Sequence, residues 1–165
     1  MNATRFLRHV FATRWSTRRR FSPKVLGAIE TAIRETEAGH AGEIRFAVET
    51  ALDMAELVED LSPRRRAMQV FGQLGVWDTA HNNGVLIYLL LADHDFEIVA
   101  DRGIDASVGR DGWEKICQQM EADFRAGDFE SGVIKGVEAV SHELATHFPR
   151  SGAGPNELPD APVVM

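Results

Sequence analysis

Carboxylate and amide side chains gather around two short segments of this 165-residue sequence. Such oxygens, together with loop carbonyls, are the donors that calcium prefers, and the ion takes about six to eight of them. The residues of this type are Asp78, Asn82, Asn83, Asp101 and Asp105. The sequence therefore predicts a divalent cation site at these five residues, with calcium favoured. The alternative is that the same side chains cap helix and strand ends or lie in solvent.

Two further hypotheses use other residues. A transition metal would take His40 or His81 as a ligand, although neither lies in an HExxH motif or a similar spacing. Asp93 and Asp95 have the spacing of the paired aspartates in haloacid-dehalogenase phosphatases, where one carboxylate is the nucleophile and the other an acid-base group. Another predicted strand begins at Phe96, so a plain hairpin turn is the better explanation.

Arginine and cysteine side chains suggest two more sites, each with a simpler structural explanation. Arginines 64–66 begin a predicted helix, where guanidinium and backbone N–H groups can bind phosphate. Pairing with Glu56, Glu59 and Asp60 is the competing explanation. Cys117 lies on the apolar side of another predicted helix, which indicates a core thiol rather than a nucleophile. As the single cysteine, it cannot form an intrachain disulfide and favours a reducing compartment.

Composition predicts one folded domain, because 26% of the residues are charged and 44% are hydrophobic. The longest apolar run, 85–92, is well below the roughly 20 residues that cross a bilayer. The first twenty residues lack the apolar core of a secretory signal. We therefore expect a cytoplasmic protein without a transmembrane segment.

Charge is divided unevenly along the chain. Residues 1–20 contain six arginines and no acidic residue, so their formal net charge is +6. The whole chain has a net charge of −7, which leaves a net charge of −13 on residues 21–165. Duplex binding relies on basic side chains that neutralise phosphates, so the acidic body argues against a nucleic-acid partner.

Hydrophobic periodicity predicts the elements that must position these side chains. The predicted helices are 23–38, 63–77, 111–126 and 129–148, and the predicted strands are 43–49, 85–91 and 96–100. Strand 43–49 alternates apolar and charged residues, which predicts one buried and one solvent-facing side. Strand 85–91 is apolar throughout, which predicts burial on both sides.

This order of elements predicts an α/β fold, a three-layer α/β/α sandwich with a small mixed central sheet. A right-handed crossover makes the first two strands parallel, and the tight turn makes the third antiparallel to the second. The starts of the first two strands and the end of the third then share one edge. The residues expected there are Glu43, Asp78, His81, Asn82, Asn83, Asp101 and Asp105. We divide the chain into a basic arm or helix (1–20), the α/β domain (21–149) and an extended tail (150–165).

Several motifs, in order, resemble the TPM domain family over about residues 21–160. They are GEIR at 42–45, FGQL at 71–74, WDT at 77–79, NGVL at 83–86, EIVADRGI at 97–104, the Trp113 helix, Gly132, HFP at 147–149 and NELPD at 156–160. The sequence is most similar to short bacterial members without a membrane anchor. The resemblance implies an α/β/α sandwich, calcium bound by acidic loops and phosphatase activity. The D-x-x-G-x-L segment of commoner members is absent, and residues 22–26 stand in its place.

Two function classes follow from these observations. One is a metal-dependent phosphatase, which would need a metal-activated water because no nucleophile with a neighbouring base is evident in the sequence. The other is a non-enzymatic interaction or scaffold module whose arm or tail docks on an unidentified protein or, weakly, on an anionic membrane surface. For the arm we expect packing on the acidic body rather than on lipid, because Arg14 and Arg18 interrupt its apolar face.

Overall fold

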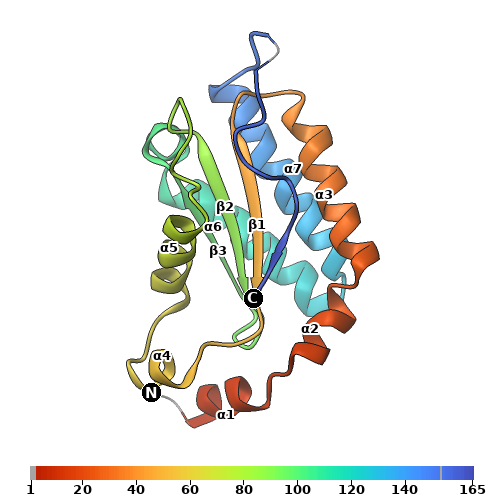
Figure 1. The fold of residues 1–165 in the computed structure, drawn as a ribbon, viewed down its shortest axis with the longest axis vertical. Coiled ribbons are helices and arrows are strands. Elements are labelled where there is room, and N and C mark those ends of the chain that lie inside the picture. The colour runs from red at the N-terminus through yellow and green to blue at the C-terminus, as the bar shows by residue number, and fades with distance from the viewer. Residues whose placement is uncertain (1–2, 153) are drawn as a thin grey trace.

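A four-stranded mixed sheet lies between two layers of helices in the computed structural model, which describes residues 3–152 and 154–165 (Figure 1). The strands are β1 (Glu43–Glu49), β2 (Gly84–Leu90), β3 (Asp95–Ala100) and β4 (Val163–Val164), in the order β3-β2-β1-β4. β2 pairs parallel with β1 and antiparallel with β3. The predicted three-layer sandwich with its mixed sheet is therefore confirmed.

The helices lie on both faces of this sheet and bury separate apolar clusters. One face is covered by α3 (Pro23–Glu37), α6 (Arg102–Ala126) and α7 (Phe129–His147). The other face is covered by α4 (Met54–Val58) and α5 (Pro63–Gln73). Both Ser-Pro starts form as predicted, since the hydroxyls of Ser22 and Ser62 accept backbone N–H groups of the first helical turn. The sequence places the end of this helix near Gly75 or Trp77, and α5 ends at Gln73, just before Gly75 leaves helical geometry at φ +64°.

α6 begins nine residues earlier than the sequence predicts. Its first part starts after Asp101, whose Oδ1 accepts the N–H of Arg102 at 2.7 Å. Gly109 then interrupts the helix at φ 72° and ψ 169°, and the predicted helix is the part that follows. Gly127 ends it in the left-handed region at φ 90°, as predicted.

The expectation of a half-buried first strand is wrong. All seven residues of β1 are buried, and its charged residues Glu43, Arg45 and Glu49 are only 5%, 6% and 6% exposed. The reason is the C-terminal tail, which covers this side of the strand. The Arg45 guanidinium donates to the carbonyl oxygens of Pro159 and Ala161.

The tail from residue 150 onward is part of the folded body. Its last residues form β4, in which Val163 pairs with Ala47 of β1 in parallel register. Met165 donates its N–H to Val48 O at 2.9 Å and accepts from Thr50 N–H at 3.1 Å. The tail therefore forms one edge of the sheet. The sequence does not predict this strand, because two residues are too few to show an alternating pattern.

The basic arm forms two helices, α1 (Ala3–Phe11) and α2 (Arg14–Arg20), at the lower end of Figure 1. Asp93, in the turn between β2 and β3, accepts from Arg5 Nε at 2.9 Å and Arg8 Nη2 at 3.3 Å, and His9 Nε2 lies 3.1 Å from it. Asp93 to Asp95 is thus the predicted hairpin turn, and it also anchors the arm. None of the described helices has the length and apolar character needed to cross a bilayer.

Candidate functional site

Two loops meet at the upper end of the sheet in Figure 1, opposite the arm. Loop 78–83 leads into β2, and residues 101–105 follow β3 and begin α6. Asp101 N–H donates to Gly84 O, and Gly103 N–H donates to Asn82 O, both at 2.9 Å. We call these two segments the acidic loop edge. The sheet topology therefore places the predicted segments side by side.

Asn83 is the most buried of the predicted ligands, with no exposed surface. Its Nδ2 donates to Ala41 O at 2.9 Å, and its N–H donates to Thr79 Oγ1 at 3.1 Å. Its Oδ1 is buried without a hydrogen-bond partner among the described residues. Asn83 thus ties the start of β1 to the edge and leaves one amide oxygen free.

Asp101 is the N-cap of α6, and only one of its carboxylate oxygens is used by the cap. Its Oδ2 is buried and accepts no hydrogen bond within the described part of the chain. Buried oxygen atoms that accept no hydrogen bond are uncommon in proteins. Burial removes their hydrogen bonds to water, and without a new hydrogen bond the free-energy cost is not compensated. The edge therefore holds two unpartnered buried oxygen atoms.

The other predicted ligands are exposed. Asn82 has a positive φ of 52°, and its carbonyl accepts from both Gly103 and Ile104, at 2.9 and 3.3 Å. Asp105 Oδ1 accepts the indole N–H of Trp113 at 2.9 Å, and Asp78 lies exposed in its loop.

Asp78, Asp101 and Asp105 do not surround a single point. In residues 3–152 and 154–165, no three His, Cys, Asp or Glu side chains are grouped to hold a metal ion. A cation at this edge would therefore take several ligands from Asn side chains, backbone carbonyls and water.

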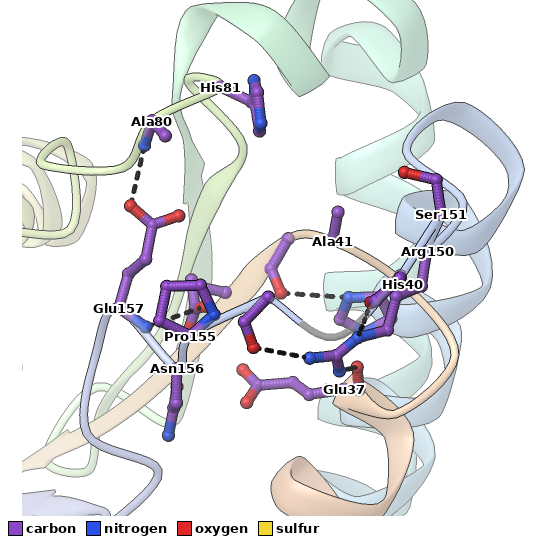
Figure 2. A pocket seen from close by; sticks show the side chains of 14 residues that line it. Glu37, His40, Ala41, Ala80, His81, Arg150, Ser151, Pro155, Asn156 and Glu157 are labelled. Atoms are coloured by element: carbon purple, nitrogen blue, oxygen red, sulfur yellow. Dashed lines mark hydrogen bonds between the residues drawn. The ribbon is translucent and has the colours of Figure 1, made fainter.

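Beside the edge lies a pocket of about 350 Å³, formed by the end of α3, the start of β1, loop 80–81 and the tail (Figure 2). Its ionisable lining residues are Glu37, His40, Glu43, His81, Arg150 and Glu157. His40, Glu43 and His81 are candidates from the sequence alone, whereas Glu37, Arg150 and Glu157 are not. Glu157 stands in the NELPD motif at 156–160, while Glu37 in the last turn of α3 and Arg150 at the start of the tail lie in no motif named above.

Arg150 holds the tail in place. Its guanidinium donates to the carbonyl oxygens of Glu37 at 2.8 Å, Gly152 at 3.0 Å and Gly154 at 3.0 Å (Figure 2). These contacts use three of the five guanidinium N–H donors and fix the side chain against the tail.

His40 is a neutral imidazole at the pocket wall. Its Nδ1 lies 3.0 Å from Gly42 O, and burial lowers its pKa. Its Nε2 is buried with no partner among the residues that the structure describes. A transition metal would require further ligands around this nitrogen, and no cluster of the described residues supplies them.

Two glutamates of the pocket bind backbone N–H groups. Glu37 accepts from Ile44 N–H at 2.8 Å, and burial raises the pKa of this carboxyl to about 8. Glu43 accepts from Glu157 N–H at 3.1 Å and Leu158 N–H at 3.3 Å, and burial raises its pKa as well. The Glu37 carboxyl therefore connects the end of α3 to β1, and the Glu43 carboxyl connects β1 to the tail.

The remaining candidates have structural roles. Arg66 pairs with Glu56 at 3.0 Å, as the sequence analysis expects, and also with Glu49 at 2.7 Å. Arg64 donates to the Glu97 carboxylate at 3.3 Å. Cys117 is buried, and burial raises its pKa to about 12, so the thiol stays protonated and belongs to the core.

Comparison with known proteins gives one family and two similar structures. The sequence matches the TPM domain over residues 18–143. The NMR structure of the BA42 protein from the psychrophilic bacterium Bizionia argentinensis is similar, with a TM-score of 0.74, 32% identity and coverage of 87% of this chain and 94% of that one.

An N-terminal domain of a protein from P. gingivalis shares the fold at a TM-score of 0.61 and 20% identity, covering 79% of this chain and 82% of that one. Among curated protein sequences, none matches this chain significantly.

Proposed function

Because the chain belongs to the TPM domain family, we propose that it binds a divalent cation, with calcium favoured, at the acidic loop edge. The observation that supports this best is the pair of buried oxygens without donors, Asn83 Oδ1 and Asp101 Oδ2. Both are oxygen atoms of the hard type that calcium prefers as ligands. Asp78, Asn82 and Asp105 would complete the donor set together with backbone carbonyls and water.

The neighbouring pocket is a weaker cation site. Glu37 and Glu43 already accept backbone N–H groups, and burial raises the pKa of both carboxyls. The pKa of Glu37 rises to about 8, and a carboxyl that holds its proton at neutral pH attracts a cation poorly. The acidic loop edge is therefore the better location.

Calcium is expected to shift the amide NMR signals of residues 78–84 and 101–105, with a dissociation constant between about 10⁻⁶ and 10⁻³ M. Asp101→Asn should weaken binding at least about tenfold, because it removes the charge and keeps a residue type that caps helices well. Asp111→Asn, an exposed change farther along α6, is the matched control and should bind like the parent protein. Unchanged signals in both loops at millimolar calcium would reject the site.

We further propose that phosphate esters are hydrolysed at this edge. When bound, a divalent cation supplies positive charge next to anionic phosphate oxygens. The chain itself contributes the start of α6, where the helix dipole favours an anion, and the exposed Arg102 beside it. Membership of the TPM domain family supports this proposal only through the phosphatase activity that the family resemblance implies.

Hydrolysis of p-nitrophenyl phosphate is expected to depend on added calcium or magnesium. Asp101→Asn should lower the rate at least about tenfold, as expected for loss of a ligand or its support, while Asp111→Asn should leave it unchanged. If the Asp101 variant, and the parent protein in excess chelator, both hydrolysed the ester as fast as the untreated parent protein, the edge would not be the catalytic site.

The interaction alternative is favoured for the arm rather than for the tail. The tail is committed to the fold through β4 and through its contacts with Glu43 and Arg45. The arm, by contrast, has exposed apolar side chains.

A further inference from the structure

Exposed apolar side chains concentrate on α1, α2 and α4. These helices lie at the end of the molecule opposite the acidic loop edge (Figure 1). Six of the nine large apolar residues that are exposed in the described chain belong to α1, α2 and α4. They are Leu7, Val10, Phe11, Trp15, Met54 and Val58. Phe11 and Trp15 are the most exposed of the arm, at 75% and 69%. Such a concentration is typical of a surface that meets an apolar partner.

α1 packs with its polar side toward the protein. Arg5 and His9 contact Asp93, and Leu52 N–H donates to His9 Nδ1 at 3.0 Å. Phe6 is half-buried against the second apolar cluster, while Leu7, Val10 and Phe11 are exposed. A surface helix of a globular protein normally turns its apolar side inward. The outward apolar side of α1 is therefore left exposed by the residues that the structure describes.

The α2 part of this surface is basic, whereas the neighbouring α4 is flanked by the exposed acidic residues Asp53 and Glu59. Arg14, Arg18 and Arg19 are exposed, and no acidic side chain of the described residues lies within ion-pair distance of them. Arg19 lies over the ring of Trp15, 5.5 Å from its centroid. Residues 1–20 contain no acid, and the rest of the chain carries −13. An anionic surface would therefore attract the arm and repel the rest of the chain.

We propose that the arm docks the protein onto an anionic lipid surface. Leu7, Phe11 and Trp15 enter the interfacial region, and the three exposed arginines contact anionic headgroups. Aromatic side chains favour this region, and each basic residue near an anionic surface contributes about 1 kcal/mol. A second copy of the chain fits less well, because a shared interface would bring two arginine clusters together.

Packing on the body and docking on lipid use opposite sides of α1. The sequence analysis treated them as alternatives, because it could not show which side of the helix faces the protein. In the structure the polar contacts to Asp93 orient α1, and this orientation leaves the apolar side outward. Docking would then direct the acidic loop edge away from the membrane, into solvent (Figure 1).

The test is co-sedimentation of the full chain with phosphatidylcholine vesicles that contain about one third phosphatidylglycerol. We expect binding that weakens as salt increases, and none to phosphatidylcholine alone. The double variants Phe11→Ser with Trp15→Ser, and Arg14→Glu with Arg18→Glu, should each lower vesicle affinity at least about tenfold. Trp77→Ser and Arg65→Glu, exposed changes outside the arm, are the matched controls and should bind normally.

Three outcomes would overturn the proposal. They are absence of binding by the parent protein, equal binding by all variants, and a concentration-dependent dimer that the Phe11 and Trp15 changes disrupt. The last would assign the surface to a second copy of the chain. Because the four arm residues are exposed, urea unfolding should be unchanged in the variants, which separates loss of binding from loss of folding.

Discussion

Replacing Glu49 with alanine is expected to lower the free energy of unfolding by about 3–5 kcal/mol. Glu49 is buried at the end of β1 and accepts from Arg66 Nε at 2.8 Å, Arg66 Nη2 at 2.7 Å and Tyr88 OH at 2.5 Å. Burial raises the pKa of Tyr88, so its hydroxyl keeps the proton that it donates. The alanine variant would leave the largely buried guanidinium of Arg66 with Glu56 as its remaining carboxylate partner and the buried hydroxyl of Tyr88 without its acceptor.

Urea unfolding at neutral pH measures this loss. Glu30→Ala is the matched control, because it removes the carboxylate of the exposed pair with Arg34 and should change stability by less than about 0.5 kcal/mol. Glu49→Gln should fall between the two, since it keeps the shape and loses the charge. If Glu49→Ala lowered the free energy of unfolding no more than Glu30→Ala does, the contacts of Glu49 with Arg66 and Tyr88 would not stabilise the fold.

Stability is also expected to decrease as the pH rises from about 4.5 to 8, because Glu37 holds its proton in the folded protein. Burial raises the pKa of this carboxyl from 4.5 to about 8. Below pH 4.5 the Glu37 carboxyl is protonated in both the folded and the unfolded chain, and above about pH 8 it is ionised in both. Between them only the unfolded chain ionises, so stability falls by up to about 1.4 kcal/mol per pH unit. Asp95, whose pKa burial raises to about 7, acts in the same direction.

Glu37→Gln tests the assignment. The amide oxygen can still accept from Ile44 N–H, but the side chain no longer ionises. The variant should match the parent protein near pH 4.5 and exceed its free energy of unfolding by about 2–4 kcal/mol at pH 8. Glu35→Gln, an exposed change on the same helix, should keep the parent profile. Parallel profiles for the parent and Glu37→Gln would show that another group causes the pH dependence.

Local patterns in the sequence were sufficient to determine most elements and the way they are arranged. Ser22 and Ser62 begin helices because a hydroxyl and a following proline satisfy the first turn, which depends only on neighbouring residues. The apolar run 85–91 and the short turn at 93–95 determine a buried strand and an antiparallel partner. The meeting of loop 78–83 with residues 101–105 then follows from the connection rules of such sheets.

Burial and charge state, in contrast, were decided only by the tertiary structure. Glu43, Arg45 and Glu49 alternate with apolar residues as in a half-exposed strand, yet the tail and α5 cover them. For Glu43 and Arg45 these contacts join residues more than one hundred positions apart, with Leu158 and Ala161, and for Glu49 the contact with Arg66 spans 17 positions. Periodicity describes which residues share a side of one element and contains no information on what packs against that side. The protonated Glu37, the pocket beside it and the outward apolar side of α1 all depend on such distant contacts.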